Sequence, residues 1–234
     1  LDGDGRADVV TGSTELSGAG SLMVWLSAKA GGFGLATSYP VAGTPADMVV
    51  ADLDGDGLRD VALVPDGRSA IAVLFNQGAG QFGKAVEYPL PARPAQVLAA
   101  DLNADGRIDL VATASGGAYL LRNAGDRQFL VSRQHAFGDS NRIGFFTLGD
   151  LDGDGAPEVI STDTVWFNDG KDASFARSEA LPMPQPCDSL AVGDLDGDGD
   201  TDVVGATRDG KVTVLDNGGS GTRWTTSTLR SSGQ

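Results

Sequence analysis

The chain has 234 residues, of which 34 are glycine and 41% are hydrophobic, and its formal net charge is −15. This length allows one large all-β domain or two small ones with a sizeable buried core. No run approaches the roughly 18 apolar residues that cross a bilayer, and the acidic balance disfavours nucleic acid, so we expect neither membrane insertion nor nucleic-acid binding.

An acidic loop recurs five times along the chain. Its copies are "LDGDGRAD" (1–8), "DLDGDGLRD" (52–60), "DLNADGRID" (101–109), "DLDGDGAPE" (150–158) and "DLDGDGDTD" (194–202). More than half of the acidic residues lie in these loops, so the acidity is local. Self-similarity at this spacing is typical of repeat proteins.

Four short apolar stretches accompany each complete loop. In the second unit they are "ADMVVAD" (46–52), "DVALV" (60–64), "AIAVLFN" (70–76) and "KAVEYPL" (84–90). Such runs, rich in Val and aromatics and bounded by Gly, Asn and Pro, predict strands rather than helices. Four strands per unit of about 40 to 50 residues predict a β-propeller of four-stranded blades.

We expect one all-β propeller domain over 1–234 with five repeat units. Their approximate bounds are 1–45, 46–94, 95–143, 144–187 and 188–234. The first unit is incomplete because the chain opens inside its loop, so we expect its natural start to lie upstream. The sequence leaves two alternatives open: five blades close a ring, or the chain is part of a larger propeller.

The loops have the pattern of calcium ligands. Ca²⁺ takes six to eight oxygens, and carboxylates at positions 1, 3, 5 and 9 with a carbonyl at position 7 can wrap one ion. Otherwise four carboxylates in nine residues would repel one another. The predicted ligands are Asp2, Asp4, Arg6 and Asp8; Asp52, Asp54, Asp56, Leu58 and Asp60; Asp101, Asn103, Asp105, Arg107 and Asp109; Asp150, Asp152, Asp154, Ala156 and Glu158; and Asp194, Asp196, Asp198, Asp200 and Asp202. We therefore predict four or five structural Ca²⁺ ions.

An EF-hand loop begins in the same way, but it needs a Glu at position 12 and a helix after it. Position 12 here is Leu63, Ala112, Ser161 or Gly205. The EF-hand alternative therefore fails, whereas simple Asp/Gly surface turns remain an alternative. Asn103 replaces a carboxylate, and Glu158 follows Pro157, so the geometry of the fourth loop is the hardest to foresee.

The loops, together with "FNQGAGQFGKAVEYP" (75–89), resemble the FG-GAP/VCBS repeats of the integrin α-subunit propeller. The resemblance covers essentially the whole chain. It implies a calcium-stabilised, non-catalytic binding or adhesion module, secreted or on the cell surface, with a protein or glycan ligand on its exposed loop face. The alternatives are an accessory domain of a secreted carbohydrate-active or degradative enzyme, and a structural subunit of an extracellular assembly with neighbouring domains or subunits.

Other candidate residues are more consistent with packing than with chemistry. Trp25 and Trp166 take the place of Leu74 in the second unit, and Trp224 takes that of Phe82, so we expect all three tryptophans in the core. Tyr39 and Tyr88, each followed by Pro, have either a turn role or a place on a recognition surface. The single His135 lacks a catalytic partner in the sequence, and the single Cys187 excludes an internal disulfide. We expect no enzymatic activity.

Overall fold

The structure, a computed structural model, describes residues 1–14, 19–137, 145–184 and 187–230. These residues form antiparallel β-sheets with no helix, which confirms the all-β prediction. The polypeptide divides into two compact units, one made of residues 1–99 and 107–135 and the other of residues 100–106 and 136–234. The predicted sequence boundaries of the five repeats stay a prediction.

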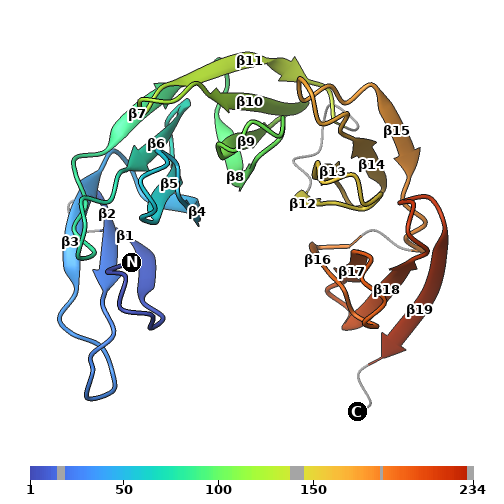
Figure 1. The fold of residues 1–234 in the computed structure, drawn as a ribbon, viewed down its shortest axis with the longest axis horizontal. Coiled ribbons are helices and arrows are strands. Elements are labelled where there is room, and N and C mark those ends of the chain that lie inside the picture. Colours follow the sequence, from blue (N-terminus) through green and yellow to red (C-terminus); the bar gives the residue numbers. More distant parts are fainter. Residues whose placement is uncertain (15–18, 138–144, 185–186, 231–234) are drawn as a thin grey trace. The chain divides into compact units, whose positions relative to one another are not determined.

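Each repeat forms its own sheet, and the five sheets are called blades 1 to 5 (Figure 1). Blade 1 has three strands, β1 (Val9–Thr14), β2 (Gly20–Trp25) and β3 (Thr37–Val41). Blade 2 has β4 (Pro45–Ala51), β5 (Asp60–Pro65), β6 (Ala70–Leu74) and β7 (Val86–Pro89). Blade 3 has β8 (Pro94–Ala100), β9 (Asp109–Ala114), β10 (Gly117–Asn123) and β11 (Phe129–His135).

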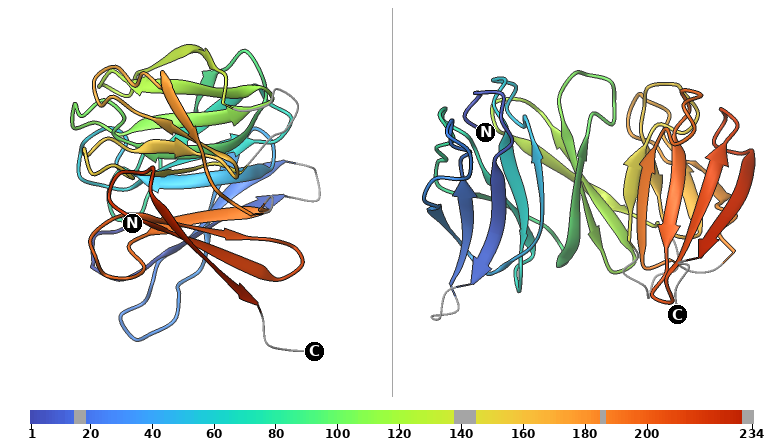
Figure 2. Two further views of the ribbon diagram at one scale, coloured as in Figure 1. Left: turned by 90° about the vertical axis from the view of Figure 1, so that its right-hand side faces the viewer. Right: turned by 90° about the horizontal axis from the view of Figure 1, so that it is seen from below.

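The second compact unit contains blades 4 and 5. Blade 4 has β12 (Thr147–Gly149), β13 (Glu158–Ile160), β14 (Thr164–Phe167) and β15 (Arg177–Ala180). Blade 5 has β16 (Ser189–Gly193), β17 (Asp202–Ala206), β18 (Lys211–Asn217) and β19 (Trp224–Arg230). In blades 2 to 5 the strands pair in chain order, as antiparallel neighbours (Figure 2, right). The four-strand prediction is thus confirmed for these blades.

The core lies between consecutive blades of the same unit. In β5 every residue is buried, as in β6 and β9, because both faces of these middle strands are covered. One apolar cluster joins blades 2 and 3 through residues such as Ile71, Val73 and Leu110. Another joins blades 4 and 5 through Ile160, Val203 and Leu215. Burial on both faces explains why these strands are continuous apolar runs rather than alternating ones.

The strand register places the repeats in equivalent positions. Trp25 lies opposite Val9, just as Leu74 lies opposite Val61 and Trp166 lies opposite Val159. Trp166 is buried and packs against Phe137 and Phe146, with ring centroids 5.1 and 6.3 Å away. Trp224 is partly buried against the core of blades 4 and 5, and Trp25 is half-buried. The packing role is confirmed for Trp166 and Trp224.

Candidate metal sites

In blades 2 to 5 the acidic loop joins the first two strands of the blade, and the aspartate at position 1 helps to fold it. In the second loop the Asp52 carboxylate accepts the N–H groups of Gly55 at 2.8 Å and Gly57 at 2.9 Å. Both glycines have positive φ, +79° and +86°, which favours a residue without Cβ. Asp150 and Asp194 accept the equivalent N–H groups in the fourth and fifth loops. These turns curl each loop around its own carboxylates.

Three loops bring carboxylates from positions 1, 3 and 9 together. In each trio the oxygens lie within 4.8 Å of one another, and the trios are Asp52, Asp54 and Asp60; Asp150, Asp152 and Glu158; and Asp194, Asp196 and Asp202. Among the described residues, the other predicted side-chain ligands lie outside these trios: Asp2, Asp4, Asp8, Asp56, Asp101, Asn103, Asp105, Asp109, Asp154 and Asp198. These aspartate clusters could hold metal ions.

The carboxylates at position 5 are exposed and close a local turn instead. Asp56 Oδ1 accepts the N–H of Leu58 at 2.8 Å, Asp154 Oδ1 accepts that of Ala156 at 2.8 Å, and Asp198 Oδ1 accepts that of Asp200 at 2.9 Å. In the third loop, Asn103 Nδ2 donates to Asp105 Oδ2 at 3.1 Å. These bonds shape the turns that carry the predicted position 7 carbonyls.

The acid at position 9 is buried and bridges two backbone segments. Asp60 accepts the N–H of Leu53 in its own loop and that of Asn76 at the end of the third strand, both at 2.8 Å. Asp202 bonds the N–H groups of Leu195 and Asn217 in the same way, at 2.8 and 2.9 Å. In the first loop Asp8 accepts the N–H of Ser27 at 2.8 Å. The acid at position 9 therefore ties two backbone segments together, a role that its position in the motif does not reveal.

Glu158 fills this role in the fourth loop despite its longer side chain and the preceding proline. It is fully buried, and its Oε2 accepts the N–H of Leu151 at 2.6 Å while its Oε1 accepts that of Asn168 at 3.4 Å. Burial, together with the charges of the Asp152 and Asp150 carboxylates, raises the pKa of Glu158 to about 7. Burial likewise raises the pKa of Asp60 to about 6. Each buried site thus disfavours its own negative charge.

The fourth loop contains a carboxylate oxygen that a cation would satisfy. Asp152 Oδ1 is buried and has no hydrogen-bond partner among the described residues. Burial and the neighbouring Asp154 and Asp150 raise the pKa of Asp152. Leaving a buried charged group unpaired costs free energy, and a hard divalent cation prefers such carboxylate oxygens. The residues of this loop fit a bound metal ion.

In blades 2 to 5, an asparagine at the end of the third strand or just beyond it bonds the acidic loop of the preceding blade. Asn123 Nδ2 donates to the Leu53 carbonyl of the preceding blade's loop at 2.8 Å, and Asn76 Nδ2 donates to that of Leu1 at 2.9 Å. Within the second unit, Asn168 and Asn217 donate to Leu102 and Leu151 at 2.8 and 2.7 Å. Sequence reasoning used these residues only to align the repeats. The sequence does carry a signal for these asparagines, since each one begins the turn that leads to the next aromatic residue of its repeat.

The remaining candidates lie in strands. Tyr39 and Tyr88 belong to β3 and β7, and their rings pack edge to face on Phe82 and Phe129 of the next blade, with centroids 5.5 and 5.1 Å apart. The turn interpretation was therefore wrong for both tyrosines. His135 ends β11, and burial lowers its pKa.

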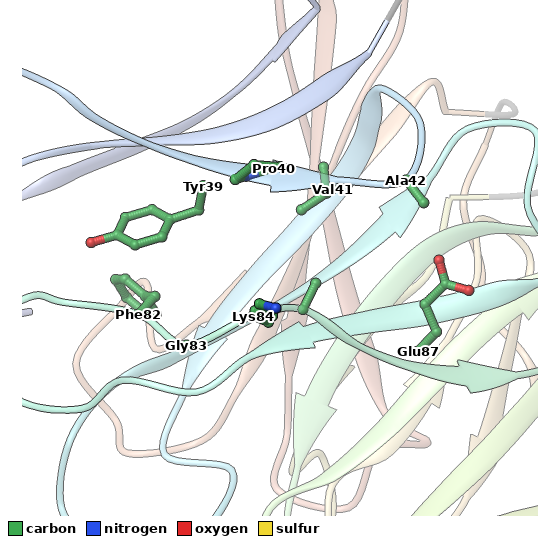
Figure 3. Close-up of a pocket in the computed structure, with 9 residues that line it drawn as sticks. Tyr39, Pro40, Val41, Ala42, Phe82, Gly83, Lys84 and Glu87 are labelled. Atoms are coloured by element: carbon green, nitrogen blue, oxygen red, sulfur yellow. The ribbon is translucent and has the colours of Figure 1, made fainter.

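A pocket of about 560 Å³ lies between β3 and β7 of the first unit (Figure 3). Its apolar part includes Tyr39, Val41 and Phe82, and Lys84 and Glu87 supply charges of opposite sign. Figure 3 shows Tyr39 above Phe82, with Glu87 at the other end. The combination of an aromatic wall and a few polar groups is typical of small ligand sites.

The profile of the FG-GAP-like repeat family matches residues 1–63, 52–112 and 101–161. The chain belongs to the FG-GAP-like repeat family. The predicted resemblance is thereby confirmed, and the matched segments each run from one acidic loop to just beyond the next. A comparison with curated protein sequences gives no match.

Several solved structures have a fold similar to that of this chain. An Agrocybe aegerita lectin that recognises non-reducing terminal N-acetylglucosamine is 21% identical with a TM-score of 0.61; the alignment covers 94% of this chain and 64% of the lectin chain. A BBS1N chain solved in complex with ARL6DN is 15% identical with a TM-score of 0.53, over 83% of this chain and 58% of that one. The FG-GAP chain thus spans about three fifths of their lengths. Among its described residues, none forms a helix capable of crossing a membrane.

Proposed function

We propose that this FG-GAP chain is a calcium-stabilised β-propeller module that binds a protein or glycan ligand outside the cell and has no catalytic activity. The observation that carries the calcium part is the unpartnered buried Oδ1 of Asp152, next to Asp150 and Glu158. A bound cation would supply the missing positive charge to these oxygens. The repetition of the trio in the second and fifth loops supports the same role there.

The arrangement of the carboxylates supports a structural rather than a catalytic role for the ion. Asp60 and Asp202 each tie the loop to the end of the third strand through two backbone N–H groups. A cation held by such a residue would clamp the same two segments together. Calcium is near millimolar outside cells, which matches the weak affinities of extracellular calcium modules. This favours the secreted or cell-surface location.

The pocket between β3 and β7 is the proposed ligand site. The Tyr39 ring lines it, and Lys84 and Glu87 could donate to and accept hydrogen bonds from a polar ligand. Aromatic faces with nearby polar groups suit both sugar rings and peptide side chains. The similar fold of a lectin is compatible with a glycan ligand. At 21% identity, this likeness supports the fold alone.

The test combines bound-metal analysis with thermal melting in calcium and in chelator. We expect several calcium ions per chain by elemental analysis and a clear loss of Tm on chelation. Asp152→Asn, which removes the unpaired charge without changing the shape, should lose about one ion and raise the Tm in chelator. Little metal and an unchanged Tm in wild-type protein would refute the calcium proposal. Glycan and peptide arrays with Tyr39→Ala as the matched variant then test the ligand site.

A further inference from the structure

An arginine from blade 3 already binds a carboxylate of the second loop that is a predicted metal ligand. Arg127 donates to Asp54 Oδ2 from Nε at 2.8 Å and lies 2.6 Å from the same oxygen through Nη2. The Asp54 side chain is only 7% exposed, so the pair is largely shielded on the carboxylate side. The other oxygen, Oδ1, accepts the N–H of Asp56 at 3.3 Å. Both oxygens of this predicted ligand therefore have partners within the chain.

The arginine is held in place from several sides. Its guanidinium lies over the Phe75 ring, with Cζ 4.6 Å from the centroid, and its backbone carbonyl accepts the Tyr88 hydroxyl at 2.5 Å. Phe75 and Tyr88 are both buried. Charge-assisted hydrogen bonds with a stacked guanidinium are stronger and better oriented than a lysine contact. The Arg127 side chain is therefore pre-positioned at Asp54.

The backbone at Arg127 is in a conformation that arginine rarely adopts. Its φ is +61°, and the residues two positions before the aromatic in blades 2 and 4 are Gly80 at +67° and Ala173 at +56°. A left-handed conformation costs about 1 kcal/mol for a residue with a side chain. Glycine would fit this turn better, so the backbone does not account for an arginine here. The contact with Asp54 accounts for the arginine at this position.

The fourth loop is the natural contrast because its third-position oxygen has no such partner. Asp152 Oδ1 is unpartnered, and the turn of blade 5 places Gly221, which has no side chain, against Leu151 in that loop. Arg177 stacks on Phe167 at 3.9 Å, but its Nη2 pairs with Glu179 at 2.6 Å. The Arg177 charge still acts on Asp152 from nearby, so the two loops differ in whether an arginine bonds the third-position carboxylate directly, as Arg127 bonds Asp54.

We propose that Arg127 is a built-in cation of the second loop, which keeps this loop folded without metal and weakens its affinity for calcium. The inference rests on the calcium role proposed above. Metal bound by Asp54 has to share this carboxylate with the guanidinium or displace it, and like charges on one carboxylate repel. The loops then fall into two classes: the second tolerates calcium loss, whereas the fourth depends on the ion.

Arg127→Gly is the sharpest variant because glycine suits the positive φ, so any loss of stability comes from the missing side chain. We expect its Tm in chelator to fall by about 2–4 °C, the shift for 1 kcal/mol in a chain of this size. We expect one calcium site to bind about tenfold more tightly in titration calorimetry, a factor that corresponds to about 1.4 kcal/mol. Arg68→Ala is the control, since Arg68 pairs with Glu87 at 2.9 Å away from the loops, and it should behave as wild type in the calcium titration.

The outcomes separate this inference from the proposed function. A wild-type chain that takes up no calcium refutes both. A wild-type chain that binds calcium, together with an Arg127→Gly chain whose titration or Tm in chelator is unchanged, refutes only the role of Arg127. Weaker calcium binding by Arg127→Gly would also overturn it, because that result would make the arginine a support of the metal site rather than a competitor.

Discussion

Replacing Asn123 by Asp tests whether the asparagine links hold consecutive blades together. The substitution preserves the shape of the side chain but replaces the amide donor with a carboxylate oxygen. Asn123 Nδ2 donates to the carbonyls of Leu53 at 2.8 Å and Ile108 at 2.9 Å, and the residue is 2% exposed. The new carboxylate would face two buried carbonyl oxygens with no donor between them.

The size of the effect follows from these two bonds. Each carbonyl left unsatisfied in a buried site costs about 1–3 kcal/mol, so we expect Asn123→Asp to lower the free energy of unfolding by about 3 kcal/mol. At roughly 2–4 °C per kcal/mol, the Tm should fall by about 6–12 °C. Urea unfolding at fixed calcium concentration measures the free energy, and the thermal melt measures the Tm.

The matched control for this substitution lies in the same turn. Gln128 is exposed, so Gln128→Glu makes the same amide-to-acid change without burying it, and it should shift the free energy of unfolding by less than about 0.5 kcal/mol. A loss below about 1 kcal/mol for Asn123→Asp, or equal losses for the two variants, would show that the asparagine bonds do not stabilise the packing of blades 2 and 3.

Three further predictions concern the loops and the core. Asp196→Ala should lower the Tm in calcium more than in chelator, because Asp196 belongs to the fifth-loop trio and otherwise accepts an N–H within its own turn, whereas Asp202→Ala should lower it in both, because Asp202 accepts two backbone N–H groups; equal effects of both variants in chelator would contradict this. In chelator, the stability contributed by Glu158 should be complete below its unfolded pKa near 4.5 and be lost as the pH rises through about 7, so the free energy of unfolding should fall by up to about 2 kcal/mol over this range. Urea unfolding measures this pH profile, and Glu158→Gln should flatten it between these two pH values. Trp166→Ala should cost about 3–5 kcal/mol because the indole packs among Phe137 and Phe146, and an unchanged Tm with lost glycan binding would instead make Trp166 a ligand residue.

Local sequence patterns predicted most of the strands because each strand carries its own signal. Val and aromatic runs between Gly and Asn turns specify β-structure within a few residues, so the runs at 60–64 and 70–76 correspond to β5 and β6. The acidic loops were equally visible, since the spacing of the aspartates and the glycines at positive φ are properties of nine consecutive residues. The irregular segment at 132–144 was harder, and much of it lies outside the described residues.

The sequence by itself determined the repeat, the strand order within each blade and the residues that could meet a metal, because all of these depend on neighbours along the chain. Only the tertiary structure decided which of those residues lie close enough together to hold an ion. The acid at position 9 proves to be buried because Asn76, which lies 16 residues later and just beyond the end of β6, donates its N–H to Asp60. Arg127 reaches Asp54 across 73 residues of sequence because blade packing brings its turn against the second loop. Such contacts depend on how blades stack, and no local pattern encodes them.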